Sequence, residues 1–246
     1  MEIDARGIYY RDLNRKIRSA VEAGERRFVL RNVNGQRYIA DGIDEKITME
    51  IYGTPGQDMA AFMKGPEIIV HGNAQDGVGN TMDDGKIVIN GMAGDIVGYG
   101  MRGGRIYIRG DVGYRVGIHM KAYKDKVPVI VIGGKAGDFL GEYMAGGIIV
   151  LLGMFGGDRN GRPPAGYFLG TGMHGGVIYI RGTVETHRLG KGLKPAELNE
   201  EERKELRIFL EDFCSTFELN INGILKEEFY RIAPNTHRPY GNMYAY

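Results

Sequence analysis

The sequence predicts a mainly β protein: a right-handed, single-stranded parallel β-helix of about seven coils, with a small N-terminal α/β cap and a C-terminal helix. Three observations support this fold class: a high glycine content, a repeat of about 19 residues, and paired apolar columns within each repeat. Of the 246 residues, 40 are glycine, about twice the usual share of roughly 7%. Because these glycines follow neither a collagen period nor the scatter of a linker, they indicate a longer repeat.

A glycine closes a six-residue segment in each repeat. The first four closing glycines are 19 residues apart, and later spacings of 23, 20 and 29 indicate the same unit with insertions. A second glycine column and a methionine column keep the same spacing. Glycine supplies the positive φ values that turn the corners of so short a coil. We therefore assign structural roles to Gly53, Gly72, Gly91, Gly110, Gly133, Gly153 and Gly182, and to Gly98, Gly117, Gly141 and Gly170.

One face of each predicted strand is consistently apolar. The positions four and two residues before the closing glycine hold Ile87 and Ile89 in one repeat, and Val129 and Val131 in another. Residues two apart on a strand share a face, so equivalent strands can stack with these side chains inside. A circuit with two or three short strands and no helical period predicts a parallel β-helix. We expect the methionines to form an internal stack: Met63, Met82, Met101, Met120, Met144 and Met173.

The opposite strand face is also apolar or aromatic in most repeats. A solvated face would alternate with polar residues, so we expect something to cover this one. Either the chain's own terminal segments or another chain could be the cover, since a contiguous apolar patch often marks an interface. The candidate interface residues stand three or one positions before the closing glycines: Ile69, Val88, Tyr107, Ile130, Val150, Tyr179, Ile132 and Leu152.

Two flanking regions differ from the repeat, which we place at residues 47–182. Residues 1–46 predict a cap: a helix over 11–24, then strands over 27–33 and 36–40 joined as a hairpin by an Asn34-Gly35 turn. Residues 183–246 predict a helix over 194–217, with Asn199 and Glu202 at capping-box spacing, and an irregular tail. The apolar stripe of that helix makes it the best candidate for a lid on the solenoid.

Composition and charge exclude several classes of protein. Lys and Arg total 32 and Asp and Glu 31, so no overall field favours nucleic acid or an anionic membrane. The N-terminus lacks the charged and apolar regions of a signal peptide, and no apolar run approaches the roughly 20 residues of a membrane span. The single cysteine, Cys214, excludes an internal disulfide and a multi-cysteine cluster within the chain. We expect a soluble cytoplasmic protein.

The residues suggest no reaction centre. The stretches 98–103 and 170–175 match the dinucleotide fingerprint, but both occupy one phase of the β repeat, whereas the fingerprint needs a following helix. The five histidines lack ligand spacing, and Cys214 has no neighbouring base, which favours a packed thiol. We expect the aspartates near the corners to bond their own backbone. These aspartates are Asp76, Asp83, Asp84, Asp95 and Asp138. The sequence therefore predicts no catalytic, cofactor-binding or metal-binding residue.

The longest departure from the repeat is the insertion at residues 154–167, rich in Gly, Asn, Arg and Pro. Long loops on solenoids often carry binding sites. The sequence leaves two interpretations equally open, a contact with a partner or substrate and a solvated loop.

The glycine pattern resembles a known family. The stretch Gly94-Asp-Ile-Val-Gly98-Tyr-Gly100-Met-Arg-Gly-Gly104, with the related spacings at Gly113–Gly117 and Gly137–Gly141, is similar to the GXGXG domain of the glutamate synthase large subunit. The preceding segment, Asn32-Val-Asn-Gly-Gln-Arg-Tyr-Ile39 followed by Asp41-Gly42, resembles the start of that domain. The resemblance covers about 180 residues. The C subunit of formylmethanofuran dehydrogenase shares the glycine repeat.

The resemblance implies a non-catalytic structural or docking subunit of a split glutamate synthase, which takes part in glutamate biosynthesis and nitrogen metabolism. Such a subunit would bridge a glutamine amidotransferase subunit and a synthase subunit, and FMN and iron–sulfur clusters would lie on those partners. Without partners, the apolar strand face could support a homo-oligomer. A scaffold subunit of a formylmethanofuran dehydrogenase-type complex is the first alternative. A carbohydrate-active β-helix is a weaker one, because its outer groove would carry charged clusters.

Overall fold

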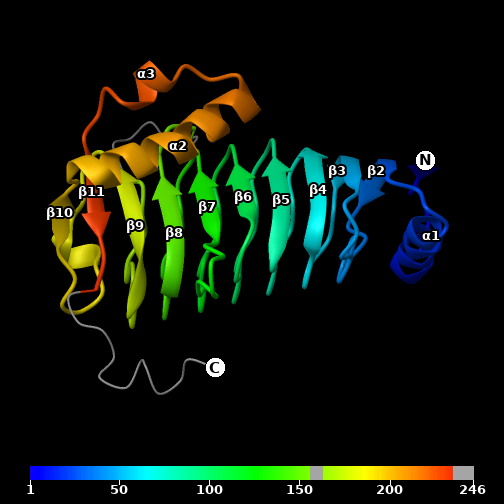
Figure 1. Cartoon of the computed structure of the whole chain (residues 1–246), viewed down its shortest axis with the longest axis horizontal. Coiled ribbons are helices and arrows are strands. Elements are labelled where there is room, and N and C mark those ends of the chain that lie inside the picture. The colour runs from blue at the N-terminus through cyan, green and yellow to red at the C-terminus, as the bar shows by residue number, and fades with distance from the viewer. Residues whose placement is uncertain (156–162, 235–246) are drawn as a thin grey trace.

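The computed structural model describes residues 1–155 and 163–234. They form one long 11-stranded sheet, in the order β1-β2-β3-β4-β5-β6-β7-β8-β9-β11-β10, with its strands side by side along the long axis (Figure 1). Strands β1 to β9 pair in parallel with their sequence neighbours. The bounds are β1 (Glu2–Asp4), β2 (Arg27–Asn34), β3 (Thr48–Thr54), β4 (Lys64–His71), β5 (Asp84–Ile89), β6 (Arg105–Ile108), β7 (Val129–Ile132), β8 (Ala145–Leu151), β9 (Gly175–Arg181), β10 (Pro195–Glu197) and β11 (Phe229–Ile232).

This arrangement confirms the predicted parallel β-helix, since each predicted repeat forms one of the strands β3 to β9. The expectation of two or three strands in each circuit is wrong, because each described circuit holds one regular strand. The second side contributes only isolated bridges, at Ala93, Val112, Ala136 and Ala165. The third side is a turn segment whose residues repeatedly adopt positive φ, which no regular strand allows.

The solenoid interior is apolar. Side chains such as Ile87 and Ile89 point inward and are fully buried, as the column pattern predicted. The six methionines of the repeat are buried in the same core and confirm the internal stack. A continuous apolar interior along the axis explains why a chain with so many glycines folds, because burial of this surface is the main driving force.

The predicted register is wrong in one coil. Ile130 pairs with Ile106, and Ile132 with Ile108, so both point into the core and not outward. The corner residue of this coil is Gly134, whose N–H donates to Gly110 O at 3.0 Å, and not Gly133. The coil insertion lies entirely before β7. Because strand side chains alternate, an error of one residue exchanges the two faces.

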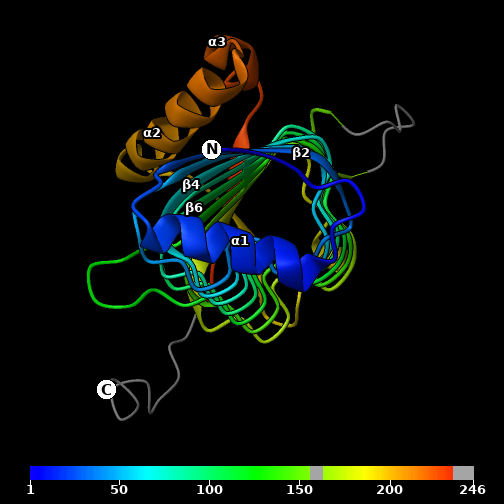
Figure 2. The ribbon, with the colours of Figure 1, turned by 90° about the vertical axis from the view of Figure 1, so that its right-hand side faces the viewer.

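The N-terminal cap differs from the predicted hairpin. Strand β2 pairs in parallel with both β1 and β3, so coil stacking already begins at β2. The predicted strand over 36–40 is instead a turn with positive φ at Tyr38 and Ala40, and Gln36 Nε2 donates to Ala5 O at 2.9 Å. Helix α1 (Tyr10–Glu22) forms as predicted and lies across the open end of the solenoid (Figure 2), burying Leu13 and Ile17.

The C-terminal region closes the other end of the sheet and covers one face. Strand β11 runs antiparallel beside β9, and β10 pairs with β11. Helix α2 (Glu200–Phe217) crosses the outer face of the strands (Figure 1) and begins with the predicted capping box at Asn199 and Glu202. It starts later than predicted because residues 195–197 form β10. The short 3-10 helix η1 (Thr186–Arg188) and helix α3 (Ile221–Ile224) complete the described elements.

Candidate functional site

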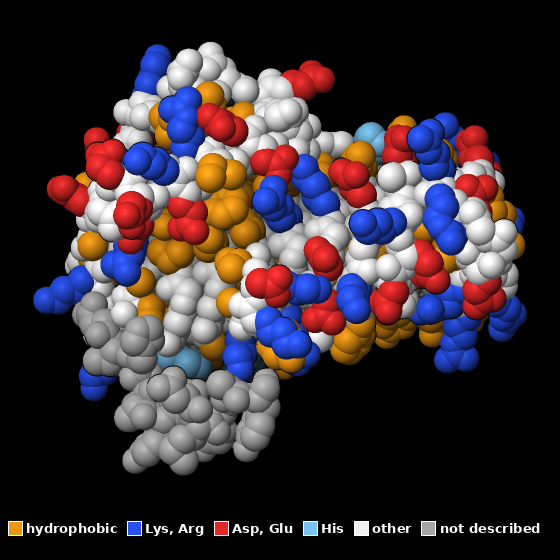
Figure 3. Space-filling model, in the orientation of Figure 1, with side chains coloured by type: hydrophobic (Ala, Val, Ile, Leu, Met, Phe, Trp, Pro, Cys, Tyr) orange, Lys and Arg blue, Asp and Glu red, His pale blue; other side chains and the backbone are white. Residues whose placement is uncertain are grey.

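The outer strand face predicted as an interface is covered by the chain's own helix α2. The face and helix share one buried core, which on the helix side includes Leu210 and Phe213. Figure 3 shows hydrophobic side chains gathered where α2 meets the strands below it. Ile69 is only half-buried at the margin of this core. The face is therefore not a free docking surface while α2 is in place, although its predicted members do lie there: Val88, Tyr107, Val150, Leu152 and Tyr179.

Besides this apolar packing, the carboxylate of Asp212 on α2 contacts three side chains of the sheet. Its Oδ2 accepts hydrogen bonds from Tyr107 Oη at 2.7 Å and Arg105 Nη1 at 2.6 Å, and its Oδ1 accepts from Lys86 Nζ at 3.0 Å. Burial raises the pKa of Asp212, but the hydrogen bonds from Tyr107, Lys86 and Arg105 outweigh burial and leave this pKa below its usual value. Burial, with the bond to Asp212, raises the pKa of Tyr107. The phenol stays neutral and the carboxylate charged.

A second contact holds the other end of α2. Tyr179 Oη donates to Glu205 Oε2 at 3.3 Å, and Arg231 Nε lies 2.7 Å from Glu202 Oε1. Burial, together with the charge of Glu205, raises the pKa of Tyr179. In both tyrosines, the apolar ring packs under the helix and the hydroxyl group hydrogen-bonds to a carboxylate of α2, which helps to position the helix.

The turn segments form a different face of the solenoid. Within each turn, three alternate residues adopt positive φ, such as Ile96, Gly98 and Gly100. The middle residue points inward: a Cβ on Gly98 would lie 2.5 Å from Ile130 Cδ1. Gly117 and Gly141 have the same environment, facing Ile149 and Ile178, and Gly170 faces the half-buried Leu193. The residues that flank the central glycines are then left at the surface.

Aromatic side chains occupy these flanking positions in successive coils. His119 stacks on Tyr143 with ring centroids 5.4 Å apart and meets the edge of Tyr99 at 5.9 Å. In a second row Phe139 stacks on Phe168 at 4.9 Å, and Tyr167 follows. Several of these rings are half-exposed, for example Tyr143 at 45% and Phe168 at 53%. We call this group the aromatic strip: Tyr99, His119, Phe139, Tyr143, Tyr167 and Phe168.

Cations accompany the aromatic strip. The Arg115 guanidinium lies 4.5 Å from the Phe139 ring centre and pairs with the buried carboxylate of Glu142, while Arg188 lies 4.3 Å from Tyr167. Two further cations lie close in sequence to members of the strip: Arg102 comes three residues after Tyr99, and Lys121 two residues after His119. Both are exposed, and neither forms an ion pair within residues 1–155 and 163–234. The sequence carried a signal for this surface, since Phe139 and Tyr143 stand two residues either side of the column glycine Gly141.

Three corner aspartates, Asp76, Asp95 and Asp138, bond the next coil and not, as expected, their own backbone. Asp76 Oδ1 accepts from Asp95 N at 2.9 Å, and Asp95 Oδ1 accepts from Tyr114 N at 2.8 Å. A Cβ on Gly113 would lie 1.9 Å from Asp95 Oδ1, so glycine is needed opposite each carboxylate. Asp138 repeats the arrangement, whereas Asp84 does accept from the adjacent Gly85 N. These aspartates join coils and are not positioned for chemistry.

Neither dinucleotide match leads into a helix. Residues 98–103 lie on a turn segment before β6, and residues 170–175 lie on the equivalent segment at the start of β9. The phosphate-binding mechanism requires a helix N-terminus at this point. The glycines of both matches are turn glycines.

The histidines and the cysteine occupy separate environments. His71 stacks on Tyr52 and lies 3.0 Å from Glu50 Oε2, His119 belongs to the aromatic strip, and His237 is outside the described residues. Among the residues described, no group of three or more His, Cys, Asp or Glu side chains could hold a metal ion. Cys214 lies on the buried face of α2, and burial raises the pKa of its thiol.

The predicted insertion at 154–167 is described only at its two ends, because residues 156–162 lie outside the described part. Its described residue Phe155 lies 5.4 Å from the Arg109 guanidinium. In the described part of the chain, the helices are too short or too polar to span a bilayer.

Comparison with known proteins agrees with this architecture. A family model described as the GXGXG motif matches residues 16–236. A protein of Methanocaldococcus jannaschii named "Uncharacterized protein MJ1350" is 51% identical over 249 residues, which cover 99% of this chain and 95% of that protein.

Proposed function

The chain belongs to the GXGXG motif family, the domain found in the glutamate synthase large subunit, and from this premise we propose that it is a non-catalytic docking subunit of a split glutamate synthase. It would bridge a glutamine amidotransferase subunit and a synthase subunit that carries FMN and iron–sulfur clusters. The observation that carries the proposal is the extent of the family match, which includes the solenoid and helix α2.

The structure supports a docking role through its exposed side chains. Helix α2 covers the outer strand face, whereas several rings of the aromatic strip are half-exposed. The aromatic strip is therefore the better candidate for contact with another protein. Exposed aromatic residues and arginine are enriched in protein interfaces, where they act as anchors. We propose that partner subunits bind at the turn face.

A rigid scaffold suits the chemistry of the complex. Stacked coils joined by backbone hydrogen bonds and by the aspartates change shape little, because each coil is held by both neighbours. Two subunits that pass ammonia between them need a fixed separation, and a stiff rod can set it. In this proposal the chain sets the distance between the partner subunits, and the partner subunits carry out the reaction.

A depletion experiment tests the proposed function. Cells from which the chain has been deleted should lose glutamine-dependent glutamate formation from 2-oxoglutarate, while glutaminase activity of the amidotransferase subunit persists. Adding the purified chain to the extract should restore the coupled activity. Unchanged glutamate formation in the depleted extract would show that the chain has another role, and a pterin-containing partner would direct attention to the formyl-transfer complexes instead.

A further inference from the structure

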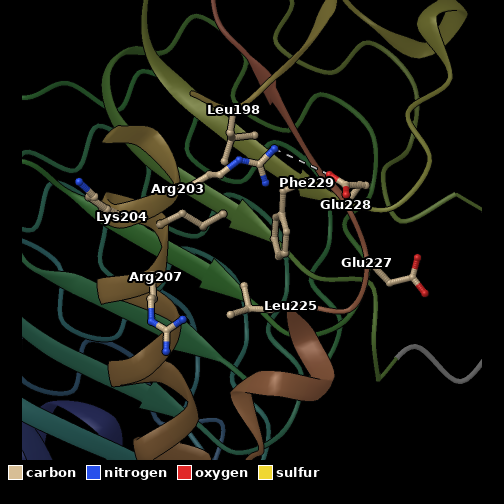
Figure 4. Close-up of a pocket in the computed structure, with 9 residues that line it drawn as sticks. Leu198, Arg203, Lys204, Arg207, Leu225, Glu227, Glu228 and Phe229 are labelled. Carbon is tan, nitrogen blue, oxygen red and sulfur yellow. Dashed lines mark ion pairs between the residues drawn. The ribbon is translucent and has the colours of Figure 1, made fainter. Parts of the chain in front are cut away.

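A pocket of about 300 Å³ lies between α2 and the segment that leads from α3 into β11 (Figure 4). Its apolar lining consists of Leu198, Leu206, Leu225 and Phe229. Three of these side chains belong to the core under α2 and are buried, while Leu225 is half-buried against it. The pocket is therefore a preformed hollow in well-packed structure. It is separate from both the aromatic strip and the solenoid interior.

Charged side chains border this apolar floor unevenly. Helix α2 contributes Arg203, Lys204 and Arg207, and the opposite segment contributes Glu227 and Glu228. Arg203 reaches toward Glu228, but their closest charged atoms are 3.9 Å apart, and Glu227 points away from the pocket (Figure 4). Positively charged side chains therefore outnumber negatively charged ones at the pocket mouth.

The two arginines remain able to bind an anion. Arg207 Nε donates to Glu211 Oε1 at 2.8 Å, and this single bond leaves its other donors unused by that carboxylate. Within residues 1–155 and 163–234, the guanidinium of Arg203 has only the long contact to Glu228. A guanidinium presents five donors in a fork that matches a carboxylate, so either residue can take an additional one.

We propose that this pocket binds a small amphipathic carboxylate, with its apolar body against Leu206, Leu225 and Phe229 and its carboxylate at one of the two arginines that border it, Arg203 or Arg207. The pocket volume of about 300 Å³ lies at the lower end of the roughly 300–1,000 Å³ that is typical of small-molecule sites. Sites with an apolar lining and a few convergent polar groups are typical of small-molecule binding. The inference does not depend on the proposed function.

Isothermal titration of the full chain with octanoate tests the inference, with 1-octanol as the matched probe that lacks the carboxylate. We expect one octanoate per chain, with a Kd on the order of 0.1 mM. We expect at least about tenfold weaker binding of 1-octanol, and a similar loss of octanoate affinity in the double variant Arg203→Gln, Arg207→Gln.

The variant Arg15→Gln, Lys16→Gln removes two exposed cations from α1 and should bind octanoate like the unaltered chain. Thermal melting of both double variants checks that the fold is retained. Three results would each overturn the inference: no saturable octanoate binding, equal binding of 1-octanol, or equal loss of affinity in the two double variants.

Discussion

Tyr107 Oη donates to Asp212 Oδ2 at 2.7 Å, a hydrogen bond that joins the middle of the solenoid to a helix 105 residues later. The same carboxylate accepts from Arg105 and Lys86, so three residues of two neighbouring strands converge on one helical side chain. Together with the apolar core that α2 shares with the strands, this contact holds α2 over the apolar strand face, while the aromatic strip lies on the turn face.

Replacing Asp212 by Ala should destabilise the protein by about 2 kcal/mol, because three partly buried donors lose their shared acceptor. Urea unfolding measures the change, and hydrogen exchange should show faster exchange along α2. The matched control is Glu211→Ala, the neighbouring exposed residue, which should change the free energy of unfolding by less than about 0.5 kcal/mol. Equal effects of the two variants would show that Asp212 does not fix the helix.

Replacing Gly98 by Ala should destabilise the protein by about 2–5 kcal/mol. The residue has a φ of +67°, and the new Cβ would lie 2.5 Å from Ile130 Cδ1, so backbone strain adds to overpacking. The control is Gly223→Ala, where a Cβ meets nothing within 4 Å, and it should be neutral or slightly stabilising. Urea unfolding of both variants tests whether the column glycines are structural.

The carboxyl group of Asp41 makes stability depend on pH. Burial raises the pKa of Asp41 to about 7, with a smaller contribution from Asp58, while a hydrogen bond from Ala61 N and the charge of Arg18 oppose the shift. In the unfolded chain the pKa is about 3.9. The folded state therefore binds the proton more tightly. This contribution to stability is full below about pH 4, falls as pH rises, and is lost above about pH 7.

The variant Asp41→Asn should flatten the pH dependence between about pH 5 and 7 and be more stable than the unaltered chain at pH 8. Its amide oxygen can still accept from Ala61 N, which lies 2.9 Å from Asp41 Oδ1. After allowance for partial solvent screening, we expect a gain of about 1–2 kcal/mol. Thermal melts across this range measure it, with the exposed Asp44→Asn as control. A gain that does not vary with pH would contradict the assignment.

The aromatic strip should contribute to partner binding and little to folding. The variant Tyr143→Ser, Phe168→Ser should reduce recovery of partner subunits by at least about tenfold, since truncating interface anchors commonly costs about 2 kcal/mol each. Its melting temperature should change by only a few degrees. The control Ile208→Ser removes another exposed apolar side chain, 59% exposed on α2, and should leave partner recovery unchanged.

Much of the fold could be predicted because the repeat determines which side chains share a face. The inner columns and the methionine stack follow directly from the period of the strands. The register of β7 did not follow, because Gly133 and Gly134 are consecutive and either could be the corner. The stacking hydrogen bond of Gly134 to Gly110, which only the three-dimensional structure shows, decides between them.

Other features depend on contacts between distant segments. Asn34-Gly35 is a typical hairpin signal, but β2 already has parallel partners on both sides, and β1 comes from the chain terminus. The apolar stripe on α2 predicted a lid. The position of the helix on the sheet, however, also depends on the hydrogen bond from Tyr107 to Asp212, which the sequence does not show. The aromatic residues around Gly141 are visible in the sequence, but the sequence does not show that α2 covers the apolar strand face while these rings stay half-exposed.

Affinity purification tests whether this solenoid docks the other subunits of a glutamate synthase. The tagged chain would be isolated from its native cells at low salt, and bound proteins identified by mass spectrometry with flavin absorbance recorded on the same sample. We expect recovery of a glutamine amidotransferase and a flavin-containing synthase subunit in stoichiometric amounts. Recovery of the chain alone, or with neither subunit among its partners, would contradict it.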